Sequence, residues 1–230
     1  MRNIRHIFFD LDHTLWDHDA NARKVLLDLY AEFDLVSRIS VDLPKFLKIY
    51  THLNHQLWDD YNHGRIERDY LRNERFRLVL EACGTMQTAD SIEMSDYFLH
   101  HCPRQGVLID GADVILNYLV KKYEMSIITN GFEDVQEIKL KTSGLNKYFK
   151  HVFTSESIGS KKPDPAIFEH AMKVAGVKND EVVMIGDNLK ADVGGALNAQ
   201  ITPIYFNPLG TVKSDCQWQI SHLSELMKIL

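Results

Sequence analysis

Short apolar runs, rich in β-branched and aromatic residues, recur along this chain of 230 residues and limit its fold more than any other feature. Each run is continuously hydrophobic, which is typical of strands that are buried on both faces of a sheet. From Gly111 onward, segments with helical spacing separate the runs. This alternation predicts an α/β fold with a doubly wound parallel sheet. The runs cover residues 4–9, 125–129, 151–155, 181–185 and 202–206.

The segment between about residues 19 and 103 follows a different pattern. Its apolar side chains recur at intervals of three and four residues, as at Ala22, Val25, Leu26 and Leu29, and almost no β-rich run interrupts them. The segment is therefore expected to be all-helical. Because it follows the first strand directly, we predict an α/β core domain of residues 1–16 and 104–230 with an inserted helical cap domain of residues 17–103.

The composition limits the partners of the protein. A net charge of −6 and a pI near 6.0 give no long-range attraction to a nucleic-acid polymer or an anionic membrane, while a local site for a small anion remains open. No apolar run reaches the roughly 18 residues of a membrane span. Asp10 comes too early for a signal peptide, so we expect a soluble cytoplasmic protein. Cys83, Cys102 and Cys216 have no CxxC spacing, which favours reduced thiols.

The residues that directly follow the apolar runs are unusually polar, and in an open parallel sheet this is where ligands bind. The first run ends in Asp10 and Asp12, and the run at 181–185 is followed by Asp187 and Asp192. Carboxylates that converge at one sheet edge repel one another unless a cation lies between them. Oxygen ligands without His or Cys favour Mg²⁺. The sequence therefore predicts a magnesium site at this edge.

The other polar groups at the strand ends suit a phosphate. Thr129 offers a hydroxyl, Lys162 supplies a positive charge, and the backbone N–H groups after Thr129 can point into the same space. Asp10 can then attack phosphorus as a carboxylate nucleophile, which gives an aspartyl-phosphate that water hydrolyses in a second step. Asp12, two residues further on, is the expected general acid and base.

These motifs resemble those of the phosphatases of the haloacid dehalogenase superfamily, which carry DxDxT, a Ser/Thr motif after the second strand, a Lys and an acidic GDxxxxD motif. All of them appear in that order and span nearly the whole chain, as DLDHT at 10–14, TNG at 129–131, KP at 162–163 and GDNLKAD at 186–192. The resemblance implies a Mg²⁺-dependent phosphomonoester hydrolase with a helical cap of the C1 type. Dehalogenases and phosphonatases of the superfamily lack an acid at the position of Asp12, whereas phosphate-ester hydrolases keep it.

The resemblance also implies roles for single residues. Asp10 would be nucleophile and metal ligand, Asp12 would be acid and base and give its backbone carbonyl to the metal, and Asp187 would be the third protein ligand. Thr129 and Lys162 complete the expected catalytic set.

Further residues of the same motifs are expected around this set. Asn130 and Gly131 would bind the substrate phosphate. Asp192 and Asn188 would support the metal ligands without touching the metal. His13 stands where many relatives have Gly, Asp or Glu, so its role is open.

The expected substrate is a small phosphorylated metabolite. LWDDYNHGRI at 57–66, LRNERF at 71–76 and FFDLDHTLWD at 8–17 are similar to the noncanonical pyrimidine 5′-nucleotidases, which makes a nucleoside monophosphate the leading hypothesis. Sugar-phosphate and phosphoglycolate phosphatases carry similar GxIxxxxLR patterns and are the first alternative, and a phosphotransferase or mutase is the second. From another class, a noncatalytic module that binds a phosphate ligand remains open, whereas no P-loop or GxGxxG follows any run.

Side chains in or near the predicted cap have two interpretations each. Trp16, Trp58 and Tyr61 can stack on a nucleobase or fill the hydrophobic core of the cap. Arg65 and Arg72 can reach the substrate or pair with the acidic residues that lie near them at helical spacings. The sequence does not indicate the oligomeric state.

Overall fold

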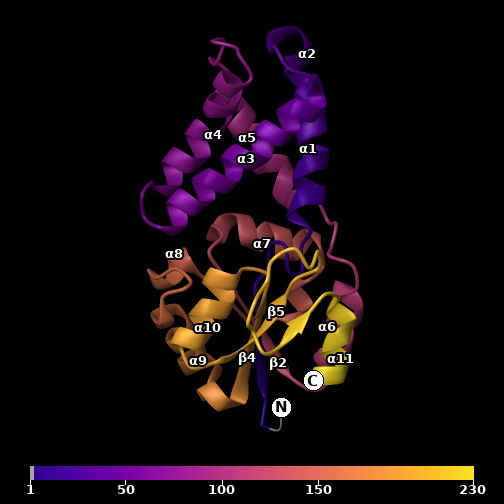
Figure 1. Ribbon diagram of the computed structural model, residues 1–230, viewed down its shortest axis with the longest axis vertical. Coiled ribbons are helices and arrows are strands. Elements are labelled where there is room, and N and C mark those ends of the chain that lie inside the picture. Colours follow the sequence, from indigo (N-terminus) through magenta and orange to yellow (C-terminus); the bar gives the residue numbers. More distant parts are fainter. Residues whose placement is uncertain (1–2) are drawn as a thin grey trace. The chain divides into compact units, whose positions relative to one another are not determined.

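The computed structural model describes residues 3–230, and the chain divides into two compact units (Figure 1). The core unit runs as far as His18 and resumes over Gly106–Leu230, and the helical unit is Asp19–Gln105. Both limits lie close to those expected from the sequence. The function of the helical unit as a cap stays a prediction.

The core unit is built on a parallel sheet, which among the described residues has the strand order β3-β2-β1-β4-β5-β6. Continuous burial of β1, from His6 to Phe9, matches its place at the centre of the sheet. The predicted parallel α/β sheet is therefore confirmed, and only the two-residue β6 was missed because it has no apolar run. The strands are β1 His6–Phe9, β2 Glu124–Thr129, β3 His151–Thr154, β4 Val182–Gly186, β5 Thr202–Phe206 and β6 Gln219–Ile220.

Helices cover both faces of this sheet, with α9 and α10 on the side opposite to α6 and α11 (Figure 1). The helices of the core unit are α6 Ala112–Leu119, α7 Glu133–Thr142, α8 Ser155–Ile158, α9 Pro165–Ala175, α10 Gly195–Asn198 and α11 Leu226–Ile229. The shorter turns are η2 Asn146–Tyr148, η3 Asn179–Glu181 and η5 Leu223–Glu225, and η4 Leu189–Gly194 is a π-helix.

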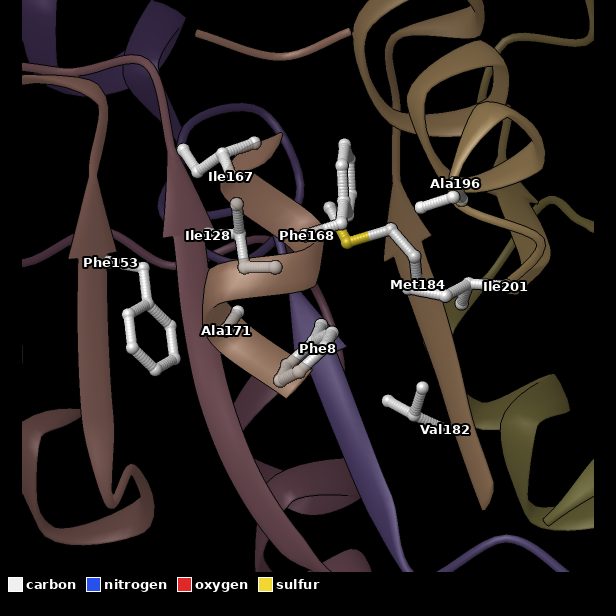
Figure 2. Close-up of a cluster of buried hydrophobic side chains, with 11 residues drawn as sticks. Phe8, Ile128, Phe153, Ile167, Phe168, Ala171, Val182, Met184, Ala196 and Ile201 are labelled. Atoms are coloured by element: carbon white, nitrogen blue, oxygen red, sulfur yellow. The ribbon is translucent and has the colours of Figure 1, made fainter. Parts of the chain in front are cut away.

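Helix α9 packs on the sheet through one apolar face. Ile167, Phe168 and Ala171 are fully buried and belong to the same cluster as Phe8 of β1 and Met184 of β4 (Figure 2). Burying a side chain such as Phe or Met contributes roughly 1.5–3 kcal/mol, so this cluster fixes the positions of the strands that carry the polar ends.

The start of α9 is set locally. Asp164 caps the helix by accepting a hydrogen bond from the Ala166 N–H at 2.9 Å, and Pro165 occupies the first helical position. Gly176, at φ +68°, ends it in the left-handed conformation that glycine adopts without strain. The cap and the proline fix the start of α9, and so the path of the chain just after Lys162.

Helices make up the secondary structure described for the helical unit, as the spacing predicts. Its core contains the rings of Tyr50, Phe76 and Phe98, whose centroids lie 5.5–5.8 Å apart. The buried Arg75 guanidinium lies 4.8 Å from the Phe98 ring centre and donates to Asn54 Oδ1 at 3.1 Å. The elements are α1 His18–Glu32, α2 Leu35–Arg38, α3 Leu43–Asn62, α4 Arg68–Ala82, α5 Ser91–His101 and η1 Cys102–Arg104.

The composition predicts a chain without a membrane span and with reduced thiols. Over residues 3–230, none of the helices is both long enough and apolar enough to cross a membrane. The cytoplasmic location stays a prediction. Cys83, Cys102 and Cys216 are free, as their spacing predicted.

Candidate active site

The loop after β1 carries the two aspartates that follow the first apolar run. The Asp10 N–H donates to Ile185 O at 2.9 Å and so continues the pairing of β1 with β4. The backbone then turns back, because the N–H groups of Leu15 and Trp16 both donate to Leu11 O at 2.9 Å. His13 lies at the turn with φ +62°, a left-handed conformation that few residues other than glycine adopt. The backbone conformation of His13 therefore helps to shape this loop.

Three carboxylates meet at the ends of β1 and β4. Carboxylate oxygens of Asp10, Asp187 and Asp192 all lie within 4.8 Å of one another, and we call these residues the strand-end cluster. The Thr14 hydroxyl lies 3.1 Å from Asp187 Oδ1 and 3.4 Å from Asp10 Oδ2, so it bridges the two. The sheet has brought together acidic residues that are far apart in the sequence.

Lys162 lies against this cluster with its side chain 2% exposed. Its ammonium group donates to Asp10 Oδ1 and Asp192 Oδ1 at 2.6 Å each, and to Ile128 O at 2.7 Å. An ammonium has three N–H donors, and these contacts use all of them. The predicted positive charge is present, but in this arrangement its hydrogen bonds orient Asp10 and Asp192.

The backbone of Lys162 is held from β2. Asn130 accepts from the Lys162 N–H through Oδ1 at 2.8 Å and donates through Nδ2 to Lys162 O at 3.0 Å. The side chain of Asn130, expected to bind substrate, thus fixes the lysine, and its contact with a substrate stays a prediction.

Asp192 reaches the cluster because of the loop after β4. Asn188 caps η4, with its side chain accepting from the N–H groups of Lys190 and Ala191 at 3.0 and 2.9 Å. Asp192 Oδ2 then accepts from the Asn188 N–H at 3.0 Å. A Cβ at Gly186 would overlap the Asp192 carboxylate, so glycine is required there. With both oxygens bonded to the chain, Asp192 supports its neighbours.

The charges in the strand-end cluster are not balanced. Burial raises the pKa of Asp10 to about 7, although Lys162 acts in the opposite direction. Burial and the charges of Asp10 and Asp192 raise the pKa of Asp187 to about 8. Burial alone would lower the pKa of Lys162, but Asp10 and Asp192 outweigh it and raise that pKa above its usual value. An oxygen-only site with excess negative charge fits a hard divalent cation.

Asp12 has the opposite surroundings, although it is only two residues from Asp10. The Lys139 ammonium donates to Asp12 Oδ1 at 2.5 Å, the Gln136 amide donates to Oδ2 at 2.8 Å, and His18 Nδ1 lies 3.7 Å from Oδ1. We call Lys139 and Gln136 the α7 donor pair. Burial alone would raise the pKa of Asp12, but Lys139 and His18 hold this pKa well below its usual range.

Thr129 ends β2 beside these groups. Its hydroxyl oxygen accepts from Gln136 Nε2 at 2.8 Å and from the Gly131 N–H at 3.0 Å. A Cβ at Gly131 would overlap the Gln136 amide, so only glycine fits. Because two N–H donors occupy the oxygen lone pairs, the O–H of Thr129 is available to donate to a phosphate oxygen.

Trp16 belongs to the core unit and is fully buried. The Lys139 ammonium lies 4.4 Å from its ring centre, within the range of a cation–π interaction. In this arrangement Trp16 supports Lys139. Stacking of Trp16 on a nucleobase stays a prediction.

The other residues expected to bind substrate belong to the helical unit. Trp58 and Tyr61 make an edge-to-face contact with ring centres 5.7 Å apart. Arg65 is half exposed and pairs with Asp60 at 2.5 Å and with Asp59, which is the solvated pairing that its spacing favours. Roles of these side chains and of Arg72 in substrate binding stay predictions.

Sequence reasoning missed the groups that surround Asp12 and bridge Asp10 to Asp187. Thr14 was visible as the last residue of the DLDHT motif. Gln136 and Lys139 had a weaker signal, because each is a polar residue on a face of α7 that also carries the buried Leu140. A polar side chain on the buried face of a helix that follows a site loop indicates such a contact.

Fold and site together define the class of the protein. The family model of haloacid dehalogenase-like hydrolases matches residues 4–200. The chain therefore belongs to the haloacid dehalogenase-like hydrolases, and the resemblance drawn from its motifs is confirmed.

Individual relatives are also similar over nearly the whole chain. Pyrimidine 5′-nucleotidase PynA of Streptococcus pneumoniae is 33% identical over 204 residues, which cover 88% of this chain and 83% of that protein. Pyrimidine 5′-nucleotidase YjjG of Escherichia coli is 29% identical over 233 residues, 97% and 96% of the two chains. The magnesium-bound crystal structure of the HAD-hydrolase YfnB from Bacillus subtilis superposes with a TM-score of 0.89 at 28% identity, covering 100% and 99%.

Proposed function

We propose that this protein hydrolyses phosphate monoesters with Asp10 as the nucleophile, and that its substrates are pyrimidine nucleoside 5′-monophosphates. The observation that carries the reaction type is the contrast between two neighbouring carboxylates. Asp10 lies in the strand-end cluster, while Asp12 is held separately by the α7 donor pair. Two carboxylates in different environments can serve as nucleophile and as acid and base.

Mg²⁺ is the proposed cofactor. Asp10, Asp187 and the backbone carbonyl of Asp12 would hold it, and it would neutralise negative charge on the carboxylates and on the phosphate. The oxygen-only donor set and the raised pKa values of Asp10 and Asp187 support this choice. So does the magnesium in the structure of YfnB.

The chain's own residues supply the steps of the reaction. Lys162 and Thr14 orient Asp10, and the free O–H of Thr129 holds the phosphate. A carboxylate oxygen of Asp10 attacks phosphorus, the bond to the ester oxygen breaks, and Asp12 protonates the departing alcohol. Water then attacks the aspartyl-phosphate, Asp12 takes its proton, and phosphate leaves while the Asp10 carboxylate is restored.

Two observations favour pyrimidine nucleotides as substrates. PynA and YjjG are both pyrimidine 5′-nucleotidases, and YjjG aligns with nearly the whole chain. The cap stretches at 57–66 and 71–76 resemble the same subgroup. An acid at Asp12 further favours a phosphate ester over a halogenated acid as substrate.

A panel of phosphate esters tests this function. Release of phosphate from pyrimidine monophosphates should exceed release from purine nucleotides, sugar phosphates and phosphoglycolate by about 10-fold, the order that one pocket contact supplies. Equal rates on sugar phosphates would refute the nucleotide assignment. Transfer of phosphate to added alcohols in place of release would identify a phosphotransferase, and ligand binding without turnover would identify a noncatalytic module.

The nucleophile is tested by Asp10→Asn. We expect turnover to fall by about 10⁴-fold or more, because the amide is a poor nucleophile. Circular dichroism should show an unchanged fold. An unaltered rate in this variant would refute Asp10 as the nucleophile.

A further inference from the structure

The carboxylate of Asp12 is held on both of its oxygens by α7. Lys139 donates to Oδ1 at 2.5 Å and Gln136 donates to Oδ2 at 2.8 Å. An ammonium group and an amide N–H can only donate, so Asp12 is the acceptor at both contacts. The same carboxylate is expected to act as acid in one half of the reaction and as base in the other. With one donor on each oxygen, the two contacts fix the orientation of the Asp12 carboxyl group.

We propose, on the basis of the proposed role of Asp12, that Lys139 and Gln136 are positioning residues that hold Asp12 as the base for hydrolysis of the aspartyl-phosphate. They act through Asp12 and need not touch the substrate. Their effect is isolated in the second half of the reaction, in which water is deprotonated, when the leaving group of the substrate departs without an acid.

The Lys139 side chain that contacts Asp12 is buried in the core unit. Lys139 is 6% exposed, and its ammonium lies over the ring of the fully buried Trp16. Lys141 on the same helix provides a contrast, because it pairs with Glu137 at 2.7 Å while both side chains are about two-thirds exposed. An exposed pair of that kind contributes little, whereas a buried lysine must keep a partner for its charge.

The contact with Gln136 links the base to the phosphate site. The same amide nitrogen also donates to Thr129 Oγ1 at 2.8 Å, and the amide occupies the space that a side chain at Gly131 would fill. Gln136 thus fixes the Asp12 carboxylate relative to the hydroxyl that is proposed to hold the phosphate. This sets where an attacking water can lie between the two.

The donor pair leaves Asp12 able to accept a proton. A carboxylate offers about four lone-pair positions, and the α7 donors use one on each oxygen. A water molecule can therefore still donate to Asp12. As its oxygen bonds to phosphorus, its proton moves to Asp12, and the bond between phosphorus and Asp10 breaks with the electron pair returning to the Asp10 carboxylate.

The test is Lys139→Met with p-nitrophenyl phosphate as substrate. Its leaving group departs without an acid, so the first step is preserved and hydrolysis of the phosphoenzyme becomes limiting. We expect kcat and KM to fall together by about 10- to 100-fold, less than a full acid–base contribution of about 10²- to 10⁴-fold, because Asp12 itself remains. The ratio kcat/KM should stay within about threefold, because it reports the steps up to release of the alcohol. A burst of nitrophenolate and an intact-mass signal of phosphorylated enzyme should appear.

Further variants complete the design. Lys141→Met, the exposed lysine on the same helix, should leave both constants unchanged. Gln136→Leu should repeat the Lys139→Met pattern to a smaller extent, and it carries the test if Lys139→Met does not fold by circular dichroism. In an Asp12→Asn background, Lys139→Met should change phosphoenzyme hydrolysis by less than about twofold, because residues that act as a unit are not additive.

Other outcomes would overturn the role of the donor pair. A fall in kcat/KM equal to the fall in kcat, with no accumulated phosphoenzyme, would place Lys139 in the first step or in the fold. The same loss in the Asp12→Asn background would show that Lys139 does not act through Asp12. Failure of the wild-type protein to hydrolyse any phosphate ester of the panel would refute the proposed function itself, and the role of the donor pair with it.

Discussion

The strand-end cluster and Asp12 differ in charge balance, although Asp10 and Asp12 are separated by a single residue. In the cluster, Lys162 faces three carboxylates, and the pKa values of Asp10 and Asp187 rise to about 7 and about 8, chiefly through burial. At Asp12, burial is outweighed by Lys139 and His18, and the pKa falls well below its usual range. The first region needs an additional cation, and the second already has its own.

This difference teaches that burial does not by itself decide the role of a carboxyl group. Burial alone would raise the pKa of each of Asp10, Asp12 and Asp187, and the partners from elsewhere in the chain determine whether the pKa rises or falls. Lys139 lies 127 residues from Asp12 in the sequence. The difference in pKa between these neighbouring carboxyl groups is thus a property of the packed site.

Loss of a proposed metal ligand from the strand-end cluster should have the largest effect on the protein. Asp187→Asn removes one proposed ligand of Mg²⁺, so we expect turnover to fall by about 10³-fold, comparable to the loss of a strong electrostatic contact. Chelation of Mg²⁺ from the wild-type protein should reduce turnover to a similar level.

Thermal unfolding separates the two effects of this substitution. Without Mg²⁺ the variant should melt above the wild-type protein, because burial and neighbouring charges penalise the ionised form of Asp187 in the folded protein, and added Mg²⁺ should raise its Tm less. Asp180→Asn, at an exposed carboxylate, is the control and should change neither property. A variant that keeps both turnover and its stabilisation by Mg²⁺ would contradict Asp187 as a ligand.

Removal of the Lys162 ammonium, the positive charge that the cluster already has, should have the second-largest effect. Lys162→Met leaves the buried carboxylates of Asp10 and Asp192 without their shared partner. We expect the free energy of unfolding to fall by about 3–5 kcal/mol, the usual cost of breaking a buried pair, as measured by urea denaturation without Mg²⁺.

The control for this substitution is an exposed ion pair. Lys150 pairs with Glu124 at 2.7 Å, and both side chains are about half exposed. Lys150→Met should cost less than about 1 kcal/mol. Equal losses for the two variants would mean that Lys162 does not balance the cluster.

The smallest expected effect is a pH dependence of stability caused by His6, at the other end of β1. Here burial, and not a neighbouring charge, is the main cause of the pKa shift. Burial lowers the pKa of His6 to about 4, with Glu124 opposing this shift. Since the folded pKa lies below the ordinary value of 6.5, only the unfolded chain gains a proton between pH 6.5 and 4, and stability falls as the pH falls. Because of His6, the free energy of unfolding should therefore fall by about 2 kcal/mol between pH 7.5 and pH 5.

This pH dependence can be measured by urea unfolding at the two pH values. His6→Gln should flatten it, whereas His52→Gln, at an exposed position, should leave the wild-type slope. An unchanged slope in His6→Gln would assign the acid sensitivity to other groups.

Much of the fold could be predicted because buried parallel strands have a simple pattern. The runs at 125–129 and 202–206 are found as β2 and β5 almost to the residue. Since parallel strands end at one edge, the positions of Asp10, Asp187 and Thr129 followed from the order of the runs. Local pattern and topology were sufficient for these residues.

The partners of these residues were harder to predict. Asn130 was expected to face the substrate, but its amide holds the backbone of Lys162. Lys139 belongs to no sequence motif, because only its contacts with Asp12 and Trp16 in the folded protein connect it to the site. Contacts between side chains on distant elements depend on packing, which periodicity does not specify.

The sequence by itself determined the parallel sheet, the helical insertion and the family of the protein, because these depend on the hydrophobic pattern and on short motifs. Only the tertiary structure decided how charge is divided at the strand ends. Asp10 and Asp12 are the same residue type in one motif, yet Lys162 and Lys139 reach them from different elements. The electrostatic field at a carboxylate depends on distances in space, and folding sets these distances.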